Sequence, residues 1–172
     1  GLTVMDNNIY LDHNATSPLL PEAQTAMNDA AGKSIGNPSS PHWAGRDAKI
    51  LLEQSRNSLA ISLGAEPREI IFTSGGSESN NAVLRQLIVA SGEQHLITST
   101  IEHPSVLETC RILAKQPNIS LTELPVDSSG LINPESLKDE ILSQTTLISL
   151  MAANNETGCI QPIEELCQIA RE

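Results

Sequence analysis

Aromatic residues are scarce in this chain of 172 residues. Only 2% of the sequence is aromatic, and the whole supply consists of Tyr10, Trp43 and Phe72. Proteins that stack nucleic-acid bases on aromatic platforms need more such side chains than this. A flat ring bound by this protein must therefore be held by other groups.

Basic residues are also few. The chain has 10 Lys plus Arg against 21 Asp plus Glu, which makes the formal net charge -11, and no stretch is dense in Lys and Arg. Binding to the backbone of a nucleic acid or to an anionic membrane surface depends on such a basic patch. We therefore expect neither nucleic acid nor a membrane as a partner.

Cysteines and long apolar runs are equally limited. The three cysteines, Cys110, Cys159 and Cys167, are an odd number and lack metal-ligand spacing, so we expect no metal site and a reducing, cytoplasmic compartment. No apolar run approaches the roughly 20 residues of a membrane span. The first ten residues lack the charged and apolar regions of a signal peptide, so no targeting segment is expected.

What the chain does have is a regular alternation of apolar segments, and its 39% of hydrophobic residues is enough for a core. Apolar spacing and turn residues predict helices over 21–32 and 44–63. The pattern then predicts strands over 69–73, 95–99, 119–124 and 146–151, separated by helices over 77–91, 104–115 and 134–142 and followed by one over 162–171. Strands joined by single helices are parallel when they share a sheet. The predicted fold class is α/β, with a mostly parallel sheet and alternating helices.

Ligands of such sheets bind beyond the carboxyl ends of the strands, and polar residues follow three of the four predicted strands. After the first come Gly75, Gly76 and Ser77, where two glycines allow close backbone approach and Ser77 opens a helix. This arrangement suits a phosphate group. The same residues also fit a simple turn in which Ser77 only caps the helix.

His103 follows the second of these strands, and the run Asn154–Gly158 follows the fourth. An imidazole and carboxamides on adjacent loops suit a phosphorylated ring. Alternatively, His103 is an ordinary polar residue at a helix start, and the asparagines only form a turn. No nucleophile with an evident partner accompanies them. The lysines (Lys33, Lys49, Lys115 and Lys138) fall away from the strand ends, and Cys159 has no cationic neighbour in sequence to lower its pKa.

Five motifs occur in order along the chain: YLDHNATSP at 10–18, GNPSS at 36–40 with His42, Gly45 and Arg46 after it, EIIFTSGGSESNN at 69–81, EH at 102–103 and NNETG at 154–158. Together they resemble the cysteine desulfurases of the NifS and IscS type. These enzymes belong to the class V aminotransferase group and to the fold type I enzymes that use pyridoxal phosphate. The resemblance extends over the whole chain.

The resemblance implies roles for four residues. Gly76 and Ser77 would bind the cofactor phosphate, with Ser77 where the family usually has threonine. His103 would lie against the pyridine ring and assist proton transfer at the substrate, which makes it the expected catalytic residue. Asn155 would form a hydrogen bond with the ring oxygen of the cofactor. Residues 14–16 would border the substrate entrance without a catalytic role.

The resemblance also implies that the family's chain continues past Glu172. The continuation carries the aspartate that pairs with the pyridine nitrogen, a glutamine, the Ser-x-His-Lys run with the Schiff-base lysine, a substrate-binding arginine and the cysteine that accepts sulfur. We therefore expect residues 1–64 to lead into the large domain and 65–172 to form the first half of the cofactor-binding domain. Such an N-terminal fragment should not be a competent desulfurase alone, because it lacks the acceptor nucleophile.

The implied partners are L-cysteine, a second copy of the chain in a homodimer, and a sulfur-acceptor or iron–sulfur scaffold protein. Selenocysteine lyase, or another class V aminotransferase-like activity, is the alternative within the enzyme class. A stand-alone module that binds partners without catalysis is the alternative outside it. The unpaired sheet edge expected after the last helix argues against such a module and favours aggregation of the isolated chain.

Overall fold

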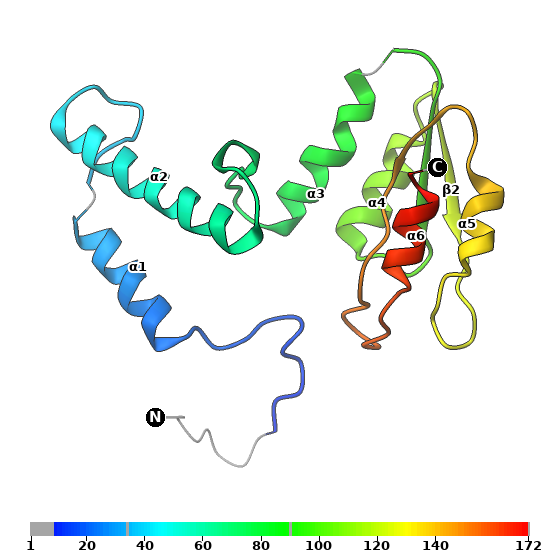
Figure 1. Ribbon diagram of the computed structural model, residues 1–172, viewed down its shortest axis with the longest axis horizontal. Helices are drawn as coiled ribbons and strands as arrows, with labels where there is room; N and C mark the ends of the chain where they lie inside the picture. The colour runs from blue at the N-terminus through cyan, green and yellow to red at the C-terminus, as the bar shows by residue number, and fades with distance from the viewer. Residues whose placement is uncertain (1–8, 34, 90, 172) are drawn as a thin grey trace. The chain divides into compact units, whose positions relative to one another are not determined.

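The computed structural model describes residues 9–33, 35–89 and 91–171. The elements described before residue 94 are all helical, and strands and helices alternate from there on (Figure 1). Contacts within the chain divide it into two units, one ending at Phe72 and the other beginning at Thr73. The boundary predicted after residue 64 falls inside the first unit. None of the helices in the described ranges combines the length and apolar character that crossing a bilayer requires.

Two helices dominate the first unit. Helix α1 spans Pro21–Lys33 and helix α2 spans Trp43–Leu63, so both predicted helices are confirmed. The imidazole of His42 caps α2 by accepting a hydrogen bond from the Gly45 amide at 3.4 Å. Gly64 ends the helix in the left-handed conformation, with φ of 65°, which glycine adopts at low cost.

The strand predicted over 69–73 is wrong. Pro67–Glu69 form a short 3-10 helix, η1, and the Glu69 carboxylate accepts the Glu66 amide at 2.7 Å. The residues after η1 are extended at first, but no strand in the described part of the chain pairs with them. Ile71 is 81% exposed and Phe72 is 46% exposed. An apolar run becomes a strand only when a neighbour supplies hydrogen bonds to its backbone, and here the Ile70 carbonyl accepts from the Arg56 side chain instead.

The second unit contains a parallel sheet, which confirms the predicted fold class. Its strands are β1 (Gln94–Ser99), β2 (Ile119–Leu124) and β3 (Thr145–Ile148), in the order β2-β1-β3. Leu96 of β1 lies opposite Leu121 and Leu147, and both pairings are parallel. The predicted last strand, 146–151, is longer than β3 because the Met151 amide donates to the carboxylate of Glu102 rather than to a strand.

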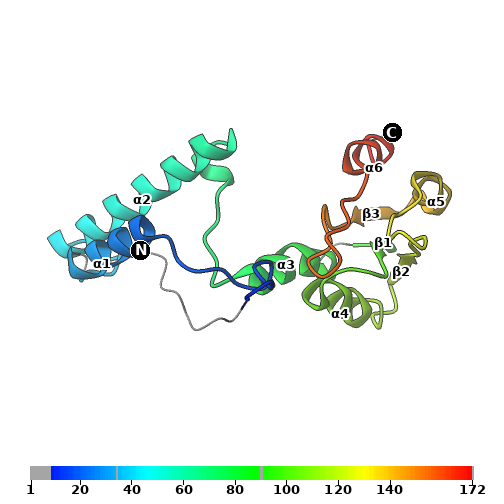
Figure 2. The ribbon, with the colours of Figure 1, turned by 90° about the horizontal axis from the view of Figure 1, so that it is seen from below.

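The helices of this unit lie close to their predicted positions but end earlier. They are α3 (Gly76–Leu84), α4 (Pro104–Leu113), α5 (Pro134–Glu140) and α6 (Ile163–Ile169). The helix predicted over 77–91 tightens after α3 into the 3-10 helix η2, Arg85–Val89. Figure 2 shows α4 on one side of the strands and α5 and α6 on the other.

A separate apolar core covers each face of the sheet. Leu96 joins the α3 and α4 side, while its neighbour Ile97 joins the α5 and α6 side, because successive side chains of a strand point to opposite faces. The first core also contains Leu84, Leu87, Val106, Cys110, Leu113 and Ile119, and the second contains Leu124, Ile132, Leu137 and Leu166. Both faces of β1 are therefore buried.

The strand order places a topological switch point between β1 and β3. The chain leaves β1 for α4 on one face of the sheet, and it leaves the neighbouring β3 for α6 on the opposite face. Loops that depart in opposite directions open a crevice at the carboxyl ends of their strands, where ligands of α/β sheets bind. The loops that follow β1 and β3 carry His103 and Asn155, respectively.

Candidate functional site

The cradle, defined as Gly76 and Ser77, begins the first turn of α3. The first amide N–H groups of a helix have no acceptor within the helix and carry its positive dipole end. A Cβ atom built on Gly75 or Gly76 would meet no atom within 4 Å, so the backbone here has open space beside it. These features fit a bound phosphate group.

Side chains fasten the loop before α3 onto its first turns. The amide and the hydroxyl of Ser74 both donate to the Glu78 carboxylate at 2.6 Å. These two hydrogen bonds hold the pKa of Glu78 below its ordinary value. The hydroxyls of Thr73 and Ser79 lie 2.7 Å apart. These bonds order the cradle without using the amides of Gly76 and Ser77.

His103 stands immediately before α4 and caps that helix. Its Nδ1 accepts a hydrogen bond from the Ser105 amide at 3.1 Å, and Pro104 occupies the first helical position. The side chain is exposed. His103 thus stands as a polar residue at a helix start, and the capping bond uses Nδ1 and not Nε2.

Helices α3 and α4 are joined by a polar contact that sequence reasoning missed. Asn80 donates from Nδ2 to Ser105 Oγ at 2.9 Å, and Ser105 Oγ lies 2.8 Å from His103 Nδ1. Asn80 is four residues, about one helical turn, beyond Gly76. The contact therefore joins the second turn of α3 to the first turn of α4 and sets His103 beside the cradle's helix.

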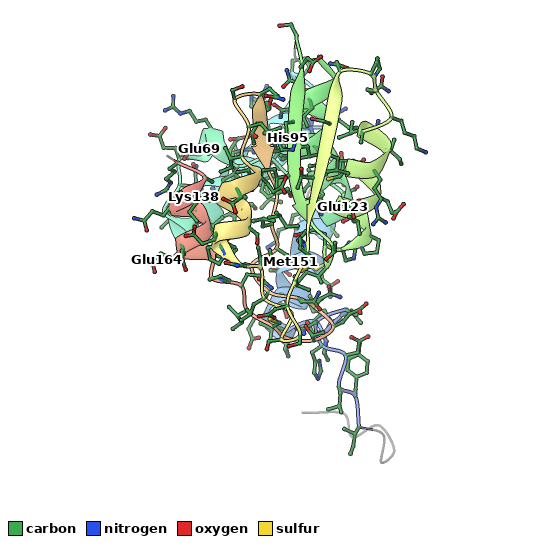
Figure 3. The ribbon with its side chains drawn as sticks, turned by 90° about the vertical axis from the view of Figure 1, so that its right-hand side faces the viewer. Glu69, His95, Glu123, Lys138, Met151 and Glu164 are labelled. Carbon is green, nitrogen blue, oxygen red and sulfur yellow. The ribbon has the colours of Figure 1, made fainter. Side chains whose placement is uncertain are left out.

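A buried carboxylate joins the loops after β1 and β3. Glu102 is 8% exposed, and its Oε1 accepts from the Ser99 hydroxyl at 3.0 Å and from the Met151 amide at 2.7 Å. We call these three residues the Glu102 clamp. Burial raises the pKa of Glu102. Figure 3 shows Met151 at the opposite end of the sheet from His95.

Asn154 adds a second connection between the same loops. Its Nδ2 donates to the Ile101 carbonyl at 3.1 Å, and its Oδ1 accepts the amides of Glu156 and Thr157, both at 2.9 Å. The turn predicted at 154–158 is therefore confirmed, and Asn154 is its structural residue. The exposed Asn155 follows on this fixed turn, beside the β1–α4 loop that carries His103.

The other polar candidates lie elsewhere. Cys159 is half-buried, and its thiol donates to the Gly130 carbonyl at 3.4 Å. The lysines lie in α1, α2 and α5 and just after α4, so none in the described chain stands on the three loops of the site. Sequence reasoning also missed Glu102 as a structural group. The signal available was an acidic residue next to His103, which is no guide to burial.

A family model described as aminotransferase class-V matches residues 9–172. The chain belongs to this family. The cysteine desulfurase IscS of Dictyoglomus turgidum is 45% identical over 170 residues, which are 98% of this chain and 43% of that protein. A solved NifS-like protein superposes with a TM-score of 0.88 at 36% identity, covering 95% of this chain and 45% of the other.

SspA, solved in complex with cysteine, also has a TM-score of 0.88, at 37% identity over 94% of this chain and 47% of its own. The chain therefore spans less than half the length of these class-V relatives. Their names and structures confirm the resemblance drawn from the five motifs, and they confirm the α/β fold.

Proposed function

We propose that the protein is a pyridoxal-phosphate-dependent cysteine desulfurase. In this proposal the chain supplies the cradle for the phosphate, the imidazole beside the ring and the amide at the ring oxygen. The observation that carries the proposal is a set of links between three elements. Helix α3, which begins at Gly76, is joined to the start of α4 at His103 through Asn80 and Ser105, and the turn of Asn155 is joined to the loop after β1 through Asn154. The relatives' names, which include cysteine desulfurase IscS, point to the same reaction.

The cradle binds the phosphate through the amides of Gly76 and Ser77 and through the Ser77 hydroxyl. A phosphate at this point also gains from the positive end of the α3 dipole. The Glu78 carboxylate faces the Ser74 amide and hydroxyl, which neutralise part of its repulsion toward a second anion. Hydrogen bonds to phosphate are charge-assisted and therefore stronger than neutral ones.

His103 and Asn155 act on the ring. With Nδ1 occupied by the Ser105 amide, the imidazole of His103 is held in place and presents Nε2 to the ligand. At Nε2 the imidazole holds or moves a proton at the substrate. The Asn155 carboxamide donates to the ring oxygen. When bound, pyridoxal phosphate supplies the electron sink for chemistry at the substrate amino acid.

In the overall reaction proposed for the whole protein, a thiolate takes the sulfur atom of L-cysteine. The products are alanine and a persulfide. The partners proposed with it are a second copy of the protein and a sulfur-acceptor or iron–sulfur scaffold protein, in the cytoplasm. Purified at its natural length, the protein is expected to release alanine from L-cysteine and to lose that activity in His103→Ala. Faster turnover of L-selenocysteine would instead favour a selenocysteine lyase.

The cradle is tested on the protein purified at its natural length by equilibrium binding of pyridoxal phosphate. Loss of the hydroxyl in Ser77→Ala should weaken binding about fivefold or more, the effect of roughly 1 kcal/mol for one hydrogen bond to a charged group. Ser62→Ala is the matched control, because that hydroxyl bonds only to a carbonyl within α2. Equal affinity for pyridoxal and pyridoxal phosphate would refute the assignment.

A further inference from the structure

A row of hydrogen bonds connects the second turn of α3 to the imidazole of His103. Asn80 Nδ2 lies 2.9 Å from Ser105 Oγ, and Ser105 Oγ lies 2.8 Å from His103 Nδ1. The amide of Ser105 reaches the same Nδ1 at 3.1 Å. One serine therefore contacts the imidazole twice, through its backbone and through its side chain.

The chemistry of these groups determines the direction of each bond. A backbone amide can only donate, so Nδ1 of a neutral His103 must accept and carries no proton. The Asn80 NH₂ group also only donates, so Ser105 Oγ accepts from it and directs its single hydrogen toward Nδ1. Both contacts to the imidazole therefore favour the tautomer with the proton on Nε2.

We propose that Asn80 and Ser105 are positioning residues that hold His103 in the Nε2–H tautomer and set its ring plane. The inference rests on the proposed function, because it concerns the nitrogen that this function assigns to the ligand. It extends that function by linking the two halves of the site. Asn80 belongs to the helix of the phosphate cradle, so the same bonds fix the spacing between a bound phosphate and the imidazole.

The tautomer is read directly by long-range ¹H–¹⁵N spectra of the chain labelled in histidine, without cofactor. In the wild type, His103 should show an unprotonated Nδ1 and a protonated Nε2. Ser105→Ala keeps the backbone bond and loses the side-chain bond, so the ratio of Nε2–H to Nδ1–H should fall about fivefold, the effect of one hydrogen bond. Ser105→Thr, which keeps the hydroxyl, should restore the ratio.

Two features of the chain serve as controls. His95 is 1% exposed and held between Thr145 and Thr122 on the sheet, so its unchanged signals certify that each variant is folded. Asn118→Ala matches Asn80→Ala, because the Asn118 side chain binds the Gly92 carbonyl at the other end of β1. The Asn118 variant should leave the His103 signals unchanged.

Binding of pyridoxal phosphate supplies the second readout. Asn80→Ala, Ser105→Ala and the double variant should weaken binding by similar factors, because residues that act through one bond are not additive. Additive losses, an Nδ1–H tautomer in the wild type, or an unchanged ratio in folded Ser105→Ala would overturn the inference. An unchanged affinity in Ser77→Ala would overturn the proposed function instead, whatever the tautomer of His103.

Discussion

Removal of the Glu102 carboxylate is the sharpest test of how the sheet edge is held together. Glu102→Ala deletes the acceptor of two hydrogen bonds, from the Ser99 hydroxyl and from the Met151 amide. At about 0.5–1.5 kcal/mol for each lost bond, the free energy of unfolding of the second unit should fall by about 2 kcal/mol. Glu102→Gln keeps an acceptor oxygen and should lose less.

Hydrogen exchange measured by mass spectrometry locates the effect. Amides of β1 and β3 should exchange about 30-fold faster in Glu102→Ala, the factor that corresponds to about 2 kcal/mol. Peptides covering α2 should not change, because that helix belongs to the first unit. Trp43, the only tryptophan, also lies there, so its fluorescence is a second internal control. Glu93→Ala removes an exposed carboxylate and should change exchange by less than about twofold.

The pH dependence of stability shows how ionisation of the Glu102 carboxyl group affects folding. Burial raises the pKa of Glu102 in the folded chain, so the folded chain holds this proton more tightly than the unfolded chain. The stability contributed by Glu102 is therefore greatest below the ordinary glutamate pKa and is lost as the pH rises through the folded-state pKa. Glu102→Gln should remove this decline. Amide exchange rates within twofold of wild type in both Glu102→Ala and Glu102→Gln at every pH would refute a stabilising role of the Glu102 clamp.

Two further predictions concern packing and reactivity. Gly45→Ala should lower the free energy of unfolding by about 1–3 kcal/mol, since its Cβ would stand 2.2 Å from the Ser40 carbonyl oxygen. Gly32→Ala, whose Cβ would meet nothing within 4 Å, should be neutral or stabilising. Urea unfolding followed by Trp43 fluorescence measures both variants, and equal midpoints would contradict the contact. Burial raises the pKa of the Cys110 thiol to about 11. Iodoacetamide should therefore label the exposed Cys167 in the folded chain and react with Cys110 only after unfolding. Similar labelling rates for the two thiols would contradict the burial of Cys110.

Local signals in the sequence determined most of the second unit. Strand β2 was predicted with its observed ends, because its apolar residues are interleaved with polar ones and turn residues flank the segment. Pro104 and Pro134 marked helix starts correctly, since proline suits the first helical turn. The motifs also indicated the family and the residues of the proposed site, because each motif is contiguous in the sequence and needs no knowledge of distant contacts.

The tertiary structure decided what depends on partners far apart in the chain. Residues 69–73 have the composition of a strand, but a strand exists only where another supplies its hydrogen bonds. Glu102 and Met151 are 49 residues apart, and Asn80 and Ser105 are 25 apart, so neither contact leaves a mark in the local pattern. The sequence by itself thus determined that His103 and Asn155 stand on loops that follow two strands of the sheet. Only packing decided that Glu102 clamps the loops and that His103 caps α4 through Nδ1.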